Sequence, residues 1–111
     1  MTHTVLLYTT WPDAETAQAV AAEAVADRLA ACANLLAPMR SIYRWDGAVD
    51  AATESPVLFK TTSDRAGALR DLIVDRHPFE VPAVVAIRVE TEGSNPAFLA
   101  WVAAGTAACD S

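Results

Sequence analysis

Three short apolar runs predict strands. They cover residues 4 to 10, 57 to 62 and 81 to 89, and each contains adjacent apolar side chains of the kind that fill the interior of a sheet. We therefore expect these three segments to lie within one sheet.

A fourth extended segment, residues 32 to 45, is longer than the others. Pro38 interrupts it, and because proline has no N–H to donate to a neighbouring strand, it marks a bulge, a bend or an edge. The dipeptide Asp46-Gly47 then suits a hairpin turn with positive φ. Residues 49 to 55 on the return arm have no regular pattern, and we expect them to be irregular.

Apolar residues spaced three and four positions apart predict two helices between the strands. The first has its apolar stripe between residues 17 and 29, and the carboxylate of Asp13 can cap it. The second has Ser63 as its candidate cap and an inward face from residue 69 to 76. It should stop near residue 77, because Pro78 disfavours helical geometry at the residue before it.

A third helix begins at Asn95-Pro96, and we expect it to bury Phe98, Leu99, Trp101 and Val102. The order of elements is therefore β-α-β-β-α-β followed by one helix. This is the split βαβ order of ferredoxin-like α+β domains, with an antiparallel four-stranded sheet and helices on one face. The whole chain, residues 1–111, is expected to form this single domain.

The segment from residue 32 to 45 is too long for a compact domain of this size. Its 14 residues would span about 46 Å at about 3.3 Å each, whereas the domain should be roughly 35 Å across. The hairpin must bend or project, and it carries Ile42, Tyr43 and Trp45 with it. Exposed aromatic side chains and open strand edges need cover, so we expect a homo-oligomer.

Charge and composition narrow the classes of partner. The net charge is -6 and the eight Lys and Arg residues form no run, which argues against a nucleic-acid partner. No apolar stretch approaches the ~20 residues that a membrane span needs, and the first residues lack the basic start of a signal peptide. We expect a cytoplasmic protein with no membrane partner. Cys32 and Cys109 lie far apart and are expected to be free thiols.

Five separated motifs resemble those of one known family. They are AACAN at 30–34, SIYRWDG at 41–47, KTT at 60–62, HPFEVP at 77–82 and NPAFLAW at 95–101. In this order and spacing they resemble the divalent-cation-tolerance (CutA) family over nearly the whole chain. The resemblance implies a ferredoxin-like subunit in a tight homotrimer, similar in architecture to PII signalling proteins, with a long hairpin that pairs with neighbouring subunits. It also implies a role in tolerance of copper and other divalent cations.

The chain departs from this family at residues associated with the metal. Copper binding in some members uses a cysteine near the end of the first strand and two adjacent histidines, and the corresponding positions here are Tyr8, Arg76 and His77. Ala83 stands where the family commonly has a glutamate. Two alternatives for the cofactor therefore stay open, none at all or a divalent cation such as copper, with His77 as the one retained ligand.

Lys60 is the first candidate for a ligand-binding residue. Its ammonium group follows three apolar residues, and it resists full burial unless it is paired or lies at a cleft. One interpretation is a solvated charge at the end of a strand. The other is a pocket between subunits that holds a small anion or an aromatic ligand, formed by Lys60, Tyr43, Trp45, Glu54 and His77.

His77 is also the candidate metal ligand, with Glu80 beside it in the sequence. Copper and zinc sites need three or four N, S or O ligands, so the remaining ligands would come from another subunit. The alternative for Glu80 is an ion pair with Arg76 or Lys60. The structural alternative for HPFEVP is a connector from helix to strand, because each proline favours extended geometry at the residue before it, and a histidine at a helix C-terminus interacts well with the helix dipole.

No nucleophile elbow, P-loop, GxGxxG turn or paired-carboxylate motif occurs in the sequence, so we predict no catalytic residues. The resulting hypothesis is a trimeric cytoplasmic protein that acts in cation tolerance or senses a small ligand without catalysis. The alternatives are a dedicated copper-binding protein that uses His77 and, as a third class, an enzyme with a pocket around Lys60.

Overall fold

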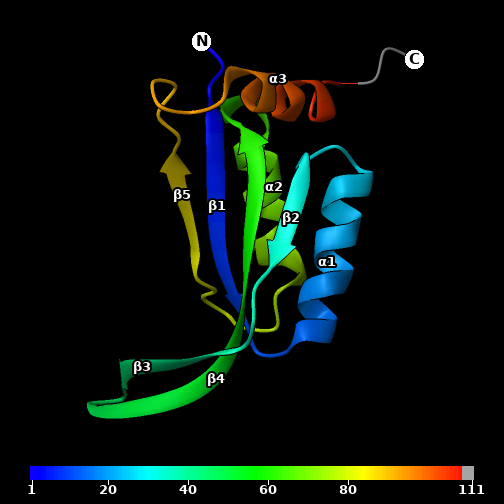
Figure 1. Cartoon of the computed structure of the whole chain (residues 1–111). Helices are drawn as coiled ribbons and strands as arrows, with labels where there is room; N and C mark the ends of the chain where they lie inside the picture. The colour runs from blue at the N-terminus through cyan, green and yellow to red at the C-terminus, as the bar shows by residue number, and fades with distance from the viewer. Residues whose placement is uncertain (109–111) are drawn as a thin grey trace.

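Residues 1–108, which the computed structural model describes, form five strands and three helices (Figure 1). The predicted α+β, ferredoxin-like order is confirmed. The elements are β1 (Thr4–Trp11), α1 (Ala14–Ala26), β2 (Cys32–Leu35), β3 (Met39–Trp45), β4 (Ala48–Thr62), α2 (Ser63–Arg76), β5 (Val84–Arg88) and α3 (Pro96–Gly105). No helix within residues 1–108 is long and apolar enough to cross a membrane.

The sheet is antiparallel throughout, with the order β2-β4-β1-β5 and with β3 paired to β4. Strand β4 is 15 residues long and changes partner along its length. Its first part pairs with β3, and its later part pairs with β2 on one side and β1 on the other. Pro38 lies in the break between β2 and β3, which confirms the predicted interruption.

Residues 49 to 55 belong to β4, so the prediction that they are irregular is wrong. Each residue from Ala48 to Glu54 has a partner on β3, from Trp45 opposite Ala48 to Met39 opposite Glu54. Asp46 and Gly47 form the turn with φ of 49° and 80°, as the sequence predicted. This hairpin is largely exposed within one chain. Its strands therefore need no alternation of apolar and polar residues, and the sequence has no such pattern to indicate a strand here.

Alternate strand residues face α1 and α2 and form the core. The core also contains the face of α1 that carries small alanine side chains, and these let the helix approach the sheet closely. Its members include Val5, Leu7 and Trp11 of β1, Val57 and Phe59 of β4, Ala17 and Ala24 of α1, and Leu69 and Ile73 of α2. Trp11 is fully buried and extends β1 beyond the predicted end of that strand.

The first helix begins as predicted but ends earlier. The Asp13 carboxylate accepts a hydrogen bond from the Thr16 backbone N–H at 2.7 Å, and this contact lowers the pKa of Asp13. Helix α1 ends at Ala26, because the chain turns into the left-handed region at Arg28, where φ is 59°. Residues 28 and 29 therefore lie outside the helix, contrary to the prediction.

The second helix ends where the sequence predicted, but its cap residue differs. Ser63 is its first residue, and the Ser63 hydroxyl accepts a hydrogen bond from the His3 backbone N–H at 3.0 Å. Thr62 occupies the cap position and makes no capping bond with its side chain. The expectation that Ser63 caps α2 is therefore wrong. The helix ends at Arg76, with His77 as the C-cap residue, as predicted.

Helix α3 lies across the end of the sheet where β1 begins, and the β3-β4 hairpin projects from the opposite end (Figure 1). The projection gives extents of 47 × 33 × 23 Å and a radius of gyration of 14.9 Å, above the ~13 Å of a compact domain of this length. Asn95 caps α3 through the Ala97 backbone N–H, as predicted.

The predicted burial of the α3 side chains is mostly wrong within one chain. Val102 is fully buried, but Phe98 and Trp101 remain 39% and 52% exposed, because α3 touches the domain along only one side. Cys32 is a free thiol, as expected. The same expectation for Cys109 lies outside the described residues.

Candidate functional site

One face of the sheet has no helix over its middle, because α1 and α2 lie on the other face and α3 lies at the end (Figure 1). The strand register places eight side chains on it in two rows. We call these eight residues the open face: Ile87, Leu6, Lys60 and Cys32 in one row, and Val85, Tyr8, Leu58 and Asn34 in the next. None of them is fully buried.

Lys60 lies in the middle of the open face. Leu6 is its neighbour on β1 and Cys32 its neighbour on β2. The Nζ atom lies 5.4 Å from the centroid of the Phe98 ring, a cation–π contact with α3. Among the ion pairs of residues 1–108, none involves Lys60. The ammonium group is therefore half-buried on an apolar face, with an aromatic ring on one side.

The predicted partners Tyr43, Trp45 and Glu54 lie on the hairpin, away from Lys60. Glu54 is opposite Met39 at the base of the hairpin, and Trp45 is beside the turn at its tip. Six positions of β4 separate Glu54 from Lys60, which is about 20 Å at about 3.3 Å per residue. One chain does not bring these residues together. The predicted pocket thus requires a second chain, as the sequence interpretation assumed, and it stays a prediction.

His77 is only 7% exposed and connects the end of α2 to the end of β1. Its Nε2 lies 2.8 Å from the carbonyl oxygen of Thr10. Because that oxygen can only accept, Nε2 carries the proton. The Nδ1 atom accepts a hydrogen bond from the Phe79 backbone N–H at 3.1 Å. Both ring nitrogens are therefore bonded within the chain, in agreement with the predicted role of HPFEVP as a connector.

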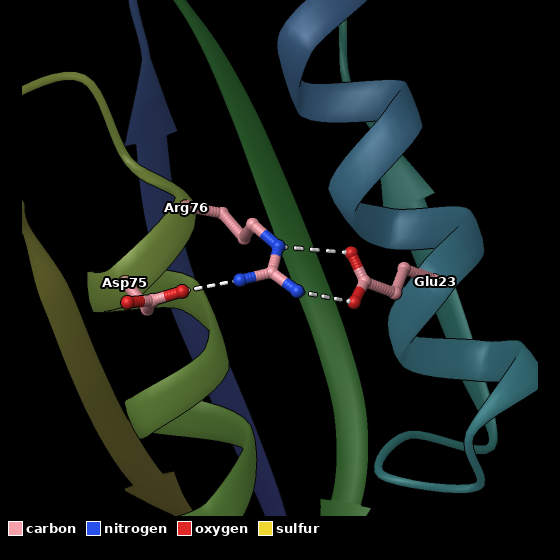
Figure 2. A network of polar contacts seen from close by, with 3 residues as sticks. All are labelled: Glu23, Asp75 and Arg76. Atoms are coloured by element: carbon pink, nitrogen blue, oxygen red, sulfur yellow. Dashed lines mark hydrogen bonds and ion pairs between the residues drawn. The ribbon is translucent and has the colours of Figure 1, made fainter.

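Arg76 joins α2 to α1 (Figure 2). It does not pair with Glu80, which lies exposed in the connector. Its Nε and Nη2 donate to the two carboxylate oxygens of Glu23 at 3.2 and 2.9 Å, and Nη1 contacts Asp75. The hydrogen bond that Arg76 donates to the Glu23 carboxylate is the main cause that raises the pKa of Arg76. The prediction of an inward-facing Arg76 is therefore wrong, because its guanidinium reaches across the surface to α1.

The donor atoms that a metal ion would need are not gathered in one place. No group of three or more His, Cys, Asp or Glu side chains suited to a metal ion occurs within residues 1–108. The hydroxyl of Tyr8 is directed at the sulfur of Met39, 3.7 Å away. A cation at His77 would have to replace one of its two hydrogen bonds and find further ligands outside this chain. Metal binding by His77 and Glu80 stays a prediction.

A hollow of about 360 Å³ lies elsewhere, between the start of α2 and the end of α3. Its polar lining is bonded internally: the Arg65 Nε donates to the Thr106 carbonyl at 2.9 Å, and the Thr62 and Thr106 hydroxyl groups are 3.4 Å apart. Sequence reasoning did not point to it, because its walls come from segments about forty residues apart that share no motif. It is separate from the open face.

The sequence profile of the family described as "CutA1 divalent ion tolerance protein" matches residues 5–105. The chain belongs to this family. Membership confirms the resemblance that the five motifs indicated, and the CutA1 family is named for tolerance of divalent ions and not for a reaction.

Individual CutA proteins match over most of the chain. The divalent-cation tolerance protein CutA of Pyrococcus horikoshii is 36% identical over 98 residues, which cover 88% of this chain and 93% of that protein. Protein CutA of Mus musculus is 38% identical over 95 residues and 86% of this chain, and the chain spans about half of the mouse protein, 52%. The structure of the periplasmic CutA of Archaeoglobus fulgidus has a TM-score of 0.87 at 31% identity, covering 94% of this chain and 99% of that one.

Proposed function

We propose that the chain acts in divalent-cation tolerance as a homotrimer that senses a small ligand or a metal ion and catalyses no reaction. Membership of the CutA1 family supports the tolerance role. The trimer, the sensing and the lack of catalysis go beyond what the family name states. The observation that carries the proposal is the amount of apolar surface that one chain leaves uncovered.

Two surfaces need cover. On the open face, Val85 and Ile87 are 52% and 45% exposed. On the hairpin, Ile42, Trp45 and Val49 are more exposed still, at 75%, 69% and 69%. Apolar patches of this kind mark interaction sites on soluble proteins, and the open edges of a projecting hairpin can pair with another strand. Each chain therefore has a hairpin that can cover a neighbour and an open face that needs cover. In a closed assembly of identical copies, each hairpin can cover the open face of the next copy.

The same assembly gives a location for the ligand. Lys60 is the charged residue of the open face, and Tyr43, Trp45 and Glu54 can approach it only from the hairpin of a neighbouring copy. A pocket between subunits in this position is the sensing site that we propose. The cytoplasmic location stays a prediction; the relative from Archaeoglobus fulgidus is described as periplasmic, and cell fractionation of the native host decides the location here.

A pair of matched substitutions tests the assembly. Ile87 on the open face and Val74 on α2 are both 45% exposed, so a glutamate at either position should be tolerated by the isolated chain. We expect Ile87→Glu to lower the sedimentation coefficient from that of a trimer to that of a smaller species, and Val74→Glu to leave it unchanged. Circular dichroism checks that both variants fold. A trimer that survives Ile87→Glu would show that the open face is not the contact surface.

A further inference from the structure

We infer that Lys60 forms a binding site for one oxyanion, a carboxylate or a phosphate group, when copies of the chain cover the open face. The inference rests on the proposed assembly and adds the chemical class of the group that the assembly must hold. Lys60 is the one charged side chain on this part of the open face.

Lys60 is isolated both in the sequence and on the surface. It is the only lysine of the 111 residues, and it is the only charged residue among the eight of the open face. Its neighbours in the row are Leu6 and Cys32, and Leu58 precedes it on the same face. In the isolated chain the ammonium group of Lys60 is hydrated by water. It loses this hydration when another surface covers the open face.

The contacts within the chain do not replace that water. The Phe98 ring lies 5.4 Å from Nζ and interacts with the charge from one side only. An ammonium has three N–H donors, and a charge that is covered without a counter-charge is strongly unfavourable. An apolar cover over the open face is therefore compatible with a charged Lys60 only if an anion accompanies it.

The surroundings of Lys60 suit a small anion. Two polar side chains, Tyr8 and Asn34, lie in the next row, about 7 Å farther along the strands. The site thus has one positive charge and neutral groups at some distance, so it matches one singly or doubly charged group. A polyphosphate would need several cations or a bound metal ion.

The anion has two sources with the same chemistry. A neighbouring copy can supply a carboxylate, and Glu54, half-buried at the base of the hairpin, is the candidate. Alternatively, a free carboxylate or phosphate ion can enter the contact from solution. In the first case the anion is part of the assembly, and in the second case the assembly responds to the concentration of the ion.

Amine acetylation tests the site on the unmodified protein, because Lys60 is the only side-chain amine. The protein is treated with an N-hydroxysuccinimide acetate, and mass spectrometry follows the peptide that contains Lys60, with the α-amino group as internal control. Inorganic phosphate replaces chloride at constant ionic strength. If a free anion binds, a phosphate concentration about 100 times Kd should slow the labelling of Lys60 about 100-fold, and the α-amino group should label at an unchanged rate.

The second arm uses Glu54→Gln. If the partner's carboxylate is the anion, Lys60 is labelled slowly even without phosphate, and Glu54→Gln restores fast labelling. Fast labelling of Lys60 in wild-type trimer, unaffected by phosphate or by Glu54→Gln, would overturn the inference and leave the proposed trimer intact. A monomeric wild-type protein, seen by light scattering of the same samples, would overturn both.

A second measurement does not depend on labelling. We expect phosphate to raise the melting temperature of wild type and of Lys60→Arg, which keeps the charge, but not that of Lys60→Met, which keeps the length and loses the charge. For a carboxylate from the partner, the melting temperature should be independent of phosphate, and Lys60→Met should lower it where Lys60→Arg does not. Equal melting behaviour of all three proteins would contradict both forms of the inference.

Discussion

The imidazole of His77 stacks on the indole of Trp11, with ring centroids 4.4 Å apart and planes inclined by 28°. The indole in turn donates to the Thr9 hydroxyl at 2.8 Å. Trp11 ends the central strand β1, and His77 follows the last turn of α2. The stack therefore fixes the connector that leads to β5, and it gives His77 a structural role whether or not a metal binds there.

Replacing His77 by alanine should destabilise the protein by about 2–4 kcal/mol. The substitution leaves the Thr10 carbonyl and the Phe79 N–H without their partner inside the fold, and it removes the stack on Trp11. Urea unfolding at one fixed protein concentration measures the loss. His3→Ala is the control, since the contacts of His3 with Ser63 use only its backbone N–H and carbonyl groups. A His77→Ala variant as stable as His3→Ala would contradict this role.

Copper titration separates the structural role of His77 from the predicted metal site. Both ring nitrogens are already bonded, so we expect His77→Ala to leave the calorimetric isotherm for Cu²⁺ almost unchanged. His3, in the N-terminal segment, is the residue at which incidental binding should occur, and His3→Ala should weaken it. A loss of tight binding in His77→Ala alone would instead establish His77 as a ligand.

Asp13 should make the stability depend on pH. Its pKa is lowered from 3.8, first by the hydrogen bond from the Thr16 backbone N–H. A carboxyl group with a lower pKa in the folded state adds stability above its unfolded pKa and loses it as pH falls through the folded pKa. Asp13→Ala should therefore cost more stability at about pH 6 than at about pH 3.

The control for this effect is Asp13→Asn, which keeps an oxygen acceptor but does not titrate. The stability difference between Asp13→Asn and Asp13→Ala should stay constant over the same range of pH. If the free energy of unfolding differs between wild type and Asp13→Ala by the same amount at both pH values, the capping carboxylate does not make the stability depend on pH.

Two glycines should respond to alanine in opposite directions. At Gly67, inside α2, a new Cβ would lie 3.8 Å from the Arg70 guanidinium, so the helix should gain about 0.5–1 kcal/mol. At Gly105 it would lie 3.1 Å from the Cβ and 3.4 Å from the Cα of Ala31, so crowding should cost about 1–3 kcal/mol. Thermal unfolding of both variants is the measurement, and a Gly105→Ala variant as stable as the wild type would show that α3 does not approach Ala31 this closely.

Short sequence signals predicted the elements that depend on local chemistry. Asn95-Pro96 begins α3, Asp46-Gly47 forms the turn, and Asp13 caps α1, because each depends on backbone geometry that a few residues determine. The order of these elements was enough to predict the ferredoxin-like arrangement and the projecting hairpin. The five motifs were enough to indicate the family.

Contacts between distant segments could not be predicted in the same way. The Glu23–Arg76 bridge joins residues 53 positions apart, and a charge on one helix does not reveal its partner on another. Trp11 was overlooked as a core residue, although it continues the buried positions Val5, Leu7 and Thr9 with a period of two. The predicted pocket around Lys60 stays a prediction, because one chain keeps Glu54 and the hairpin tip away from Lys60.

The mass of the particle in solution tests the central claim, that identical copies cover the open face and the hairpin. Size-exclusion chromatography with light scattering at micromolar concentration should give three times the chain mass of 11.8 kDa, about 35 kDa. A monodisperse particle of one chain mass would contradict the account, because the exposed side chains of β3, β4 and β5 would then remain in water.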